Sequence, residues 1–216
     1  MLEEMSRFFE ARLADYDRHM RTEIEGAEDF YPFTASQLPI SEDCILLDLG
    51  CGTGLELEEY FSLCPTARVT GIDLSEGMLA ALRSKFDGKD ITLLCGSYFD
   101  LPFGERAFDA AVSVESLHHF TGAEKLPLYA KLHRALKDGG YFILTDYFAP
   151  TEEEEHLYRA TFLALKAEQG ITDSAFYHYD TPLTVAHERE ILLNAGFASV
   201  EVLKNWDNTY TLKATK

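Results

Sequence analysis

Short apolar runs alternate with longer amphipathic stretches from residue 44 onward. The stretches 54–64, 75–86 and 121–137 predict helices, and five apolar runs around them predict strands: Cys44–Leu49, Arg68–Asp73, Ile91–Cys95, Phe108–Val114 and Tyr141–Tyr147. Parallel strands need a crossover of a dozen or more residues, so this rhythm predicts a parallel sheet. The near-continuous apolar character of Phe108–Val114 indicates that helices cover both faces of that sheet.

The C-terminal part breaks this rhythm. Thr184–Asn194 predicts one more helix, which ends at Gly196. Ser199–Leu203 and Asn208–Lys213 then alternate as two strands, with a hairpin between them. A hairpin joins antiparallel strands, so this end predicts an antiparallel edge.

Two further segments lie outside the strand–helix pattern. Residues 1–25 place apolar side chains at three- and four-residue steps, which predicts an amphipathic helix. Residues 151–170 begin with Thr151 and Glu154, a capping box, and an aromatic-rich stretch follows up to residue 182. We interpret 1–30 as an N-terminal helical lid and 151–182 as a helical insertion forming an acceptor lid, both within a single domain of residues 1–216.

Charge and composition exclude several classes of binding partner and site. The chain has 37 acidic and 19 basic side chains, a net charge of −18, and this field repels nucleic acid and anionic membranes. The four cysteines show no C-x-x-C spacing and the histidines are scattered, so neither a disulfide framework nor a metal site is predicted. The acidic N-terminus and the lack of a long apolar run lead us to expect a cytoplasmic protein.

A glycine loop follows the first predicted strand. Gly50, Gly52 and Gly54 precede a helix, and glycines there let backbone N–H groups approach a ligand closely. Asp73 ends the second predicted strand, where its carboxylate can accept both hydroxyls of a ribose. The pattern predicts an adenosine-type ligand, and at this point both NAD and S-adenosylmethionine fit.

Residues 40–146 resemble, in the correct order, the class I S-adenosylmethionine-dependent methyltransferases, especially the small-molecule branch that includes the ubiquinone-biosynthesis type. The matching runs are Leu46–Gly54, Gly96–Phe103, Phe108–Ser113, Leu117–Phe120 and Leu136–Phe142. This resemblance implies an α/β, Rossmann-like, doubly wound sheet of seven mainly parallel strands with one antiparallel strand. It also implies S-adenosylmethionine as the cofactor and S-adenosylhomocysteine as the product.

The resemblance assigns a cofactor role to thirteen residues. The methionine part would lie on Asp48, Gly50, Cys51, Gly52 and Gly54, the ribose on Asp73, the adenine on Leu74, Met78, Ser97 and Tyr98, and the sulfonium beside Glu115. Ser97 stands where many relatives carry Asp, which puts its contact to the adenine amino group in doubt. The segment around residues 15–20 resembles a lid helix, so Tyr16 would cover the cofactor and Arg21 would meet its carboxylate. An amphipathic helix that only packs is the alternative for this segment, and a solvated loop acid is the alternative for Glu115.

Methyl transfer from a sulfonium is an in-line displacement that needs an oriented nucleophile, exclusion of water and sometimes a base. The candidate catalytic residues are His118, His119 and Tyr147, because the loops after strands four and five line the site in such sheets. Adjacent histidines on a regular backbone face opposite ways, so we expect only one to point into the site. Catalysis by proximity alone, without a base, stays open.

We therefore expect an enzyme that methylates a small-molecule acceptor, whose identity and reacting atom the sequence leaves open. One alternative is a carboxy-S-adenosylmethionine synthase-like enzyme, which needs a cationic pocket that the sequence supports only through Arg21, Arg159 and Arg189. Another is a non-catalytic S-adenosylmethionine-binding module. The oligomeric state also stays open, with a homodimer as one arrangement.

Overall fold

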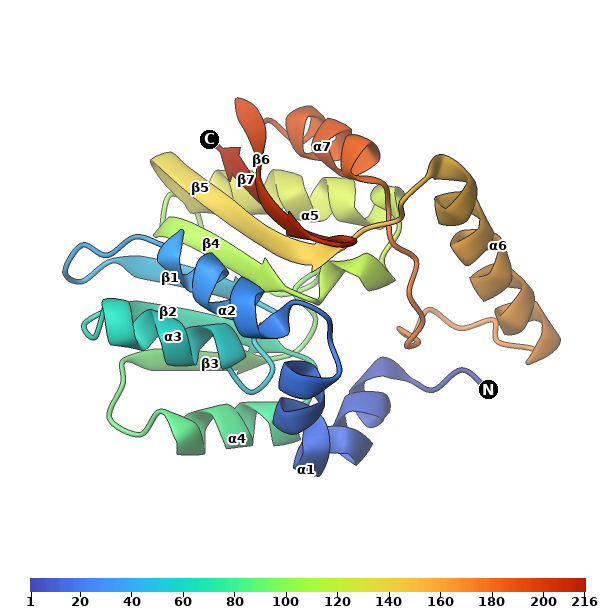
Figure 1. Ribbon diagram of the computed structural model, residues 1–216, viewed down its shortest axis with the longest axis horizontal. Coiled ribbons are helices and arrows are strands. Elements are labelled where there is room, and N and C mark those ends of the chain that lie inside the picture. Colours follow the sequence, from blue (N-terminus) through green and yellow to red (C-terminus); the bar gives the residue numbers. More distant parts are fainter.

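The computed structural model describes residues 1–216 and places seven strands in one sheet (Figure 1). The strands are β1 (Ile45–Leu49), β2 (Arg68–Asp73), β3 (Ile91–Cys95), β4 (Phe108–Val114), β5 (Leu136–Tyr147), β6 (Ser199–Trp206) and β7 (Thr209–Thr215). The helices are α1 (Met5–Thr22), α2 (Ala27–Ser36), α3 (Leu55–Leu63), α4 (Glu76–Lys85), α5 (Gly122–Ala135), α6 (Glu152–Glu168) and α7 (Val185–Asn194), with the short 3-10 helix η1 (Leu117–His119).

The strand order is β3-β2-β1-β4-β5-β7-β6. Neighbours from β3 to β5 pair in parallel, and β7 pairs antiparallel with both β5 and β6. The order reverses between β1 and β4, and in sheets of this kind a ligand binds at the carboxyl ends beside that switch. The expected α/β sheet of seven strands with one antiparallel strand is confirmed.

Side chains alternate between the two faces of the sheet. Leu47 and Ala111 point into a core shared with α5 and α7, whereas Leu46, Ala110 and Val112 point into a core shared with α2, α3 and α4. Both cores are dry, because all five of these residues have no exposed surface. Coverage on both faces explains why these strands are apolar almost without interruption.

The local signals for helix ends are confirmed in several places. Ser75 caps α4 by accepting a hydrogen bond from the backbone of Met78, and Thr121 with Glu124 forms a complete capping box on α5. Thr151 caps α6 through the backbone N–H of Glu154. These side chains satisfy backbone donors that a helix leaves free at its start.

Three boundaries differ from the expectation. Helix α2 follows α1 after a turn at Gly26 and was not expected as a separate element. Helix α5 ends at Ala135, before the expected 138–140 stop, and β5 begins at once. The residues between Leu136 and Tyr141 form a bulge, because Phe108 pairs with Leu136 while Ala110 pairs with Tyr141. The extra residues on β5 shift its register on β4 between Phe108 and Ala110.

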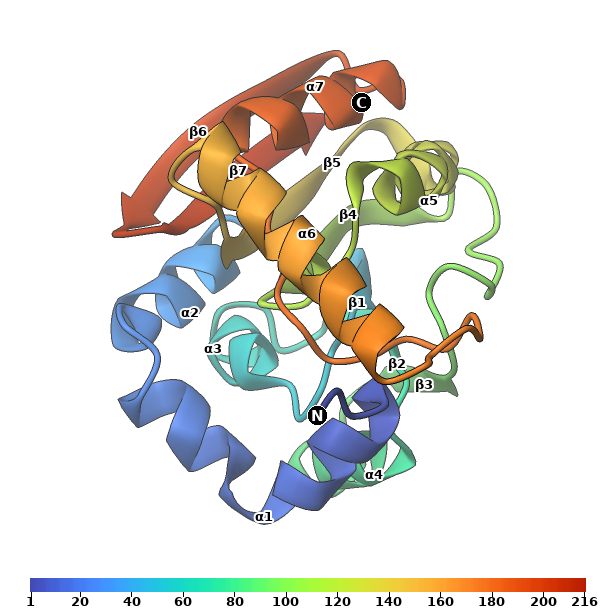
Figure 2. The ribbon, with the colours of Figure 1, turned by 90° about the vertical axis from the view of Figure 1, so that its right-hand side faces the viewer.

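The two predicted lid segments meet over one edge of the sheet. In Figure 2, α6 crosses in front of the carboxyl ends of the strands, and the chain before α1 lies beside the segment that follows α6. Glu4 and Tyr177 form an antiparallel bridge, supported by hydrogen bonds from Met5 N to Phe176 O and from His178 N to Glu3 O. The N-terminus and the 151–182 insertion are therefore joined into one cover. None of the helices is long and apolar enough to cross a membrane.

Candidate active site

The glycine loop turns sharply between β1 and α3. Gly50 and Gly52 have φ values of 75° and 47°, in the left-handed region that glycine adopts without strain. The N–H groups of Gly50 and Cys51 both donate to the carbonyl of Ile72, at 2.8 and 3.1 Å, which ties the loop to β2. A Cβ on Gly50 would lie 2.7 Å from Cβ of Ser116, so only glycine fits there.

Asp73 ends β2 directly beside this loop. Its Oδ2 accepts a hydrogen bond from Gly52 N at 2.9 Å, and its Oδ1 accepts one from Ser75 N at 2.8 Å. Burial raises the pKa of this carboxyl, and the backbone hydrogen bonds offset part of that rise. Each oxygen keeps a lone pair, so the carboxylate can still accept hydroxyl donors from a ligand.

A small cavity lies between the glycine loop and α1. Twelve residues line it: Met5, Phe9, Tyr16, Gly50, Gly52, Asp73, Leu74, Met78, Tyr98, Glu115, Ser116 and His119. Its volume is about 40 Å³, close to that of a single water molecule. Met5, Phe9 and Tyr16 contribute the α1 side of this cavity.

Several predicted cofactor residues line this cavity. They are Tyr16, Gly50, Gly52, Asp73, Leu74, Met78, Tyr98 and Glu115. The hydroxyl of Tyr98 lies 3.3 Å from Ser116 Oγ, which fixes its ring at the cavity wall. Burial raises the pKa of both Tyr16 and Tyr98, so each keeps its proton and can donate a hydrogen bond.

Other predicted cofactor residues lie away from it. Ser97 uses its hydroxyl within its own turn, accepting from Phe99 N at 3.1 Å. Arg21 lines neither this cavity nor the larger one beside it, and its guanidinium pairs with Glu58 of α3. The structure thus places the Arg21 guanidinium in an ion pair that ties α1 to α3, and its contact with the cofactor carboxylate stays a prediction.

Asp48, Cys51 and Gly54 also do not line the small cavity. Asp48 is 1% exposed and its Oδ2 has no hydrogen-bond partner; burial and then the neighbouring Glu56 raise its pKa well above the usual range. Cys51 is buried against β2, and Gly54 leaves room for the ring of Phe86. These residues shape the loop from the inside.

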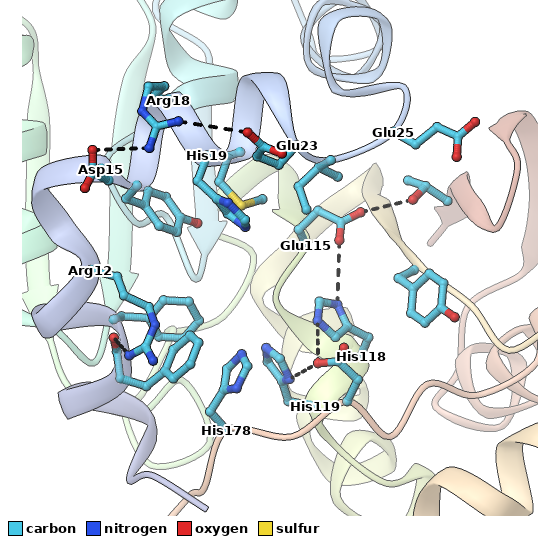
Figure 3. Close-up of a pocket in the computed structure, with 18 of the residues that line it drawn as sticks. Arg12, Asp15, Arg18, His19, Glu23, Glu25, Glu115, His118, His119 and His178 are labelled. Atoms are coloured by element: carbon cyan, nitrogen blue, oxygen red, sulfur yellow. Dashed lines mark hydrogen bonds and ion pairs between the residues drawn. The ribbon is translucent and has the colours of Figure 1, made fainter.

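A much larger cavity of about 900 Å³ adjoins the small one. It lies between α1, the β6–β7 turn and the loop 178–180, and Figure 3 shows Glu115, His118, His119 and His178 lining it. Four residues line both cavities: Phe9, Tyr16, Glu115 and His119. Glu115 and His119 are the polar groups at this junction.

His118 is held in a buried ion-pair network. Its Nδ1 lies 2.5 Å from Asp146 Oδ1, and its Nε2 lies 3.5 Å from Asp180 Oδ1. Burial by itself would lower the pKa of His118, but the charges of Asp146 and then Asp180 outweigh it and raise the pKa well above the usual value. His118 is therefore a cation at neutral pH and has no lone pair to act as a base.

His119 differs from its neighbour. Burial and then the charge on His118 lower the pKa of His119, so its ring is neutral at neutral pH. Its Nδ1 lies 3.3 Å from the carbonyl oxygen of Tyr179 and 3.2 Å from Asp180 Oδ1; both are acceptors, so Nδ1 carries the proton and Nε2 keeps the free lone pair. Of the two histidines, His119 has the protonation state that a general base requires.

Glu115 occupies a strained position at the end of β4. Its φ of 48° is unusual for a residue with a Cβ, and such strain concentrates at functional sites. The side chain is 8% exposed; one oxygen accepts a 3.4 Å hydrogen bond from Thr209, and the other lies 3.9 Å from His118 Nδ1. Burial raises the pKa of Glu115 to about 8.

Tyr147, the third candidate catalytic residue, lines the large cavity only. Its hydroxyl lies 3.2 Å from that of Tyr158 on α6. Burial is the main cause that raises its pKa above the usual range, so it keeps its proton at neutral pH. Tyr147 can donate a hydrogen bond to an acceptor molecule and is a poor base.

Sequence reasoning missed Asp146, His178 and Asp180. The fold brings His118, His119 and Asp180 together with ligand atoms within 4.8 Å of one another, and Glu115, His118 and Asp146 likewise, so each group is close enough to share a metal ion. Nothing in the linear spacing indicates this, because the members come from η1, β5 and a distant loop. The His-x-Asp pattern at 178–180 was the one local signal available.

Comparison with known proteins extends this picture. Residues 47–144 match a family model described as a methyltransferase domain. The chain is 35% identical over 59% of its length to an uncharacterised methyltransferase, sll0829, of Synechocystis, covering 58% of that protein. It is 29% identical over 85% of its length to a carboxy-S-adenosyl-L-methionine synthase of Wolinella succinogenes, covering 80% of it.

The length of the match varies among these relatives. The chain covers only 29% of the biotin biosynthesis bifunctional protein BioHC of Teredinibacter turnerae, to which it is 31% identical over 66% of its own length. It therefore spans between about a third and four fifths of the curated relatives named here.

Solved structures share the fold at low identity. Human N-acetylserotonin methyltransferase in complex with S-adenosylmethionine superposes with a TM-score of 0.68 at 18% identity, covering 96% of this chain and 56% of that one. A complex of the Haloferax volcanii Trm112 methyltransferase activator with a methyltransferase gives 0.70 at 20% identity, covering 100% and 99%.

Sequence motifs, strand order and these comparisons agree on the donor side of the site. The glycine loop, Asp73 and the wall formed by Leu74 and Met78 lie together at the switch point of the sheet. The matched domain runs from within β1 to within β5 and supplies nine of the twelve residues that line this cavity. Over residues 47–144 the chain is similar to methyltransferase domains, and its fold is shared with an S-adenosylmethionine-bound methyltransferase.

Proposed function

We propose that the protein transfers a methyl group from S-adenosylmethionine to a small-molecule acceptor. The observation that carries this proposal is the junction between two cavities: one holds Gly50, Gly52 and Asp73, and the other is large enough for an acceptor. When bound, the cofactor supplies a methyl group on a positively charged sulfur, which a nucleophile displaces in line. Adjoining cavities meet the main requirement of that chemistry, which is orientation of two reactants.

The residues of the small cavity suit this cofactor. Asp73 offers carboxylate lone pairs to the ribose hydroxyls, and Leu74 and Met78 offer an apolar wall to the adenine. Gly50 and Gly52 expose backbone to the ligand because they carry no Cβ. Glu115, at the junction, favours a positively charged group beside it once it is ionised.

The lids exclude water from the junction. Phe9 and Tyr16 of α1 line both cavities, and the ring of Phe8 stacks on His178 with their centroids 3.5 Å apart. The short antiparallel bridge between Glu4 and Tyr177 links the two lid segments. Opening α1 would admit the cofactor, and closing it would dry the site in which charge moves.

His119 is the group we assign as the base. It is neutral, it lies at the junction, and Asp180 orients its ring. We expect His119→Ala to lower kcat by about 10²–10⁴-fold if proton removal occurs in the rate-limiting step. His119→Ala with full kcat would mean that orientation alone drives the transfer.

Carboxy-S-adenosylmethionine synthesis is the second candidate, since such a synthase is among the relatives. Carboxy-S-adenosylmethionine carries an added carboxylate, and a site that binds it needs a free cation to pair with that carboxylate. The two arginines lining the large cavity are already engaged: Arg12 pairs with Glu3, and Arg18 pairs with Asp15 and Glu23. This lining favours simple methyl transfer.

Two measurements test the proposed function. Titration calorimetry with S-adenosylmethionine and S-adenosylhomocysteine should give one site per chain, and saturable binding of neither would refute it. Mass spectrometry of any nucleoside that co-purifies separates the two candidates, because the carboxylated cofactor is heavier than S-adenosylmethionine. Recovery of the carboxylated form would favour the synthase.

A further inference from the structure

The large cavity carries a surplus of negative charge. Two arginines line it, against six carboxyl side chains: Asp15, Glu23, Glu25, Glu115, Asp180 and Asp207. Arg18 pairs at the surface with two of these acids, and Arg12 lies over the ring of Phe8 and pairs with Glu3. Two arginines cannot balance six carboxyl groups, so acidic groups outnumber basic ones in the lining.

The histidines of the cavity do not remove this surplus. Burial lowers the pKa of His178 to about 4 and also lowers that of His119, so both rings are neutral at neutral pH. His118 is cationic, but it lies among three carboxyl groups, those of Glu115, Asp146 and Asp180. His19 also lines the cavity, but together with the two arginines it is outnumbered by the six carboxyl groups of the lining.

Glu115 places one of these carboxyl groups at the inner end of the large cavity, where it can contact a cationic ligand. Its side chain is 8% exposed, and it projects into the cavity (Figure 3). Its only hydrogen bond is the long one from Thr209, and its second oxygen has no hydrogen-bond donor within range. A buried carboxyl with so little protein support is costly to ionise unless a ligand brings a cation.

Aromatic rings complete the lining. Phe8, Phe9, Tyr16, Tyr147 and Trp206 all line the cavity. The faces of such rings attract cations, organic ammonium groups among them, and the rings also bury the apolar body of a ligand. Carboxylates combined with aromatic walls are the chemistry that recognises an organic ammonium ion.

We propose that the methyl acceptor is an amine that enters this cavity as its ammonium ion and is methylated on nitrogen. The inference rests on the proposed function and adds the substrate class. The ammonium loses one proton to His119 Nε2, and the neutral nitrogen then attacks the methyl carbon. The new C–N bond forms as the C–S bond breaks, its electron pair stays on sulfur, and the proton passes from His119 to water.

The single tryptophan of the chain provides the readout. Trp206 lines the cavity, so its fluorescence reports ligand entry without a label. Three probes share one apolar body and differ in charge: 2-phenylethylamine as a cation, 2-phenylethanol as a neutral molecule and 3-phenylpropanoate as an anion. The titrations use protein saturated with S-adenosylhomocysteine, with EDTA present so that no metal ion shared by His118, His119 and Asp180 alters the charge.

The amine should bind about tenfold tighter than the alcohol, a ratio worth about 1.4 kcal/mol, and the carboxylate should bind most weakly. Glu115→Gln should reduce the preference for the amine, and so should Glu25→Gln at the exposed rim, where folding is not at risk. Glu201→Gln, on the exposed edge of β6, is the matched control and should keep the full preference.

Equal or tighter binding of the alcohol or the carboxylate would overturn the inference, as would failure of the amine to bind at millimolar concentration. The calorimetric titration with S-adenosylhomocysteine on the same sample separates the two levels. If that nucleoside binds and the charge preference is absent, the amine inference fails alone. If the nucleoside does not bind, the proposed function fails first.

Discussion

Asp73→Asn is the substitution that most sharply probes the donor site. It keeps the size of the side chain and removes its charge. In the folded protein both carboxylate oxygens accept from backbone N–H groups, one from Gly52 at 2.9 Å and the other from Ser75 at 2.8 Å. An asparagine supplies one oxygen, so its amide NH₂ must face one of those two donors.

The substitution should have two separate effects, one on ligand affinity and one on the stability of the fold. A hydrogen bond to a charged acceptor contributes about 1.5–3 kcal/mol, so loss of the ribose contact should raise the Kd for S-adenosylhomocysteine by about 10- to 150-fold. In the variant, the backbone N–H of Gly52 or Ser75 faces the asparagine NH₂ and has no acceptor. This unsatisfied buried group should lower the free energy of unfolding by about 1–3 kcal/mol. The first effect appears in binding, and the second appears without any ligand.

The assay is titration calorimetry well below the unfolding temperature of each variant, with denaturant unfolding measured in parallel. Asp90→Asn is the matched control, because Asp90 forms only an exposed pair with Arg68 at 3.2 Å and such pairs contribute little. An Asp73→Asn protein that folds and binds the nucleoside with wild-type affinity would refute the assignment of this carboxylate to the ribose.

Three other predictions follow from the buried groups. The pKa of Glu115 is raised from 4.5 to about 8, so the folded protein loses stability relative to the unfolded chain as pH rises through that range. Glu115→Gln should therefore become more stable than wild type by up to about 5 kcal/mol above about pH 8. Thermal melts at acid and alkaline pH check this. Gly50→Ala combines a left-handed φ of 75° with a close approach to Ser116 and should cost about 2–5 kcal/mol in urea unfolding; Ser116→Gly in addition should recover only the steric part, and full recovery would contradict the backbone argument. Lys125→Met leaves Glu188 buried without the cation 2.6 Å away and should cost about 3–5 kcal/mol, most of which Glu188→Leu should restore if the isolated charge is the cause.

The strands could be predicted because their physics is local. Arg68–Asp73, Ile91–Cys95 and Phe108–Val114 have the predicted bounds, since apolar runs between turn residues mark buried strands directly. Helix α2 was missed because Pro32 lies inside it and its start is a left-handed glycine, Gly26, rather than a capping side chain. Its buried face depends on packing against α3, which no local pattern encodes.

Positions at the site could be predicted only where local structure decides them. Gly50, Gly52 and Asp73 line one cavity as expected, because one turn and one strand end place them there. Asp180 could not be predicted, because it reaches His118 and His119 only after the loop behind α6 pairs with the N-terminal residues. The same long-range packing separates the two adjacent histidines into a cation and a neutral ring.

The ion-pair partner of Arg21 could not be predicted from its place in the sequence. Its role at the cofactor carboxylate stays a prediction, and in the structure the neighbouring surface supplies Glu58 as its partner. Asp17, one turn earlier, likewise binds Thr53 and Lys85. These pairs anchor α1 on α3 and α4.

The most direct test of the account is a crystal structure of the protein with S-adenosylhomocysteine. The account predicts the ribose on Asp73, the adenine against Leu74 and Met78, and the sulfur at the junction of the two cavities, facing Glu115 and His119. A nucleoside bound elsewhere, or one whose sulfur faces away from the large cavity, would contradict it.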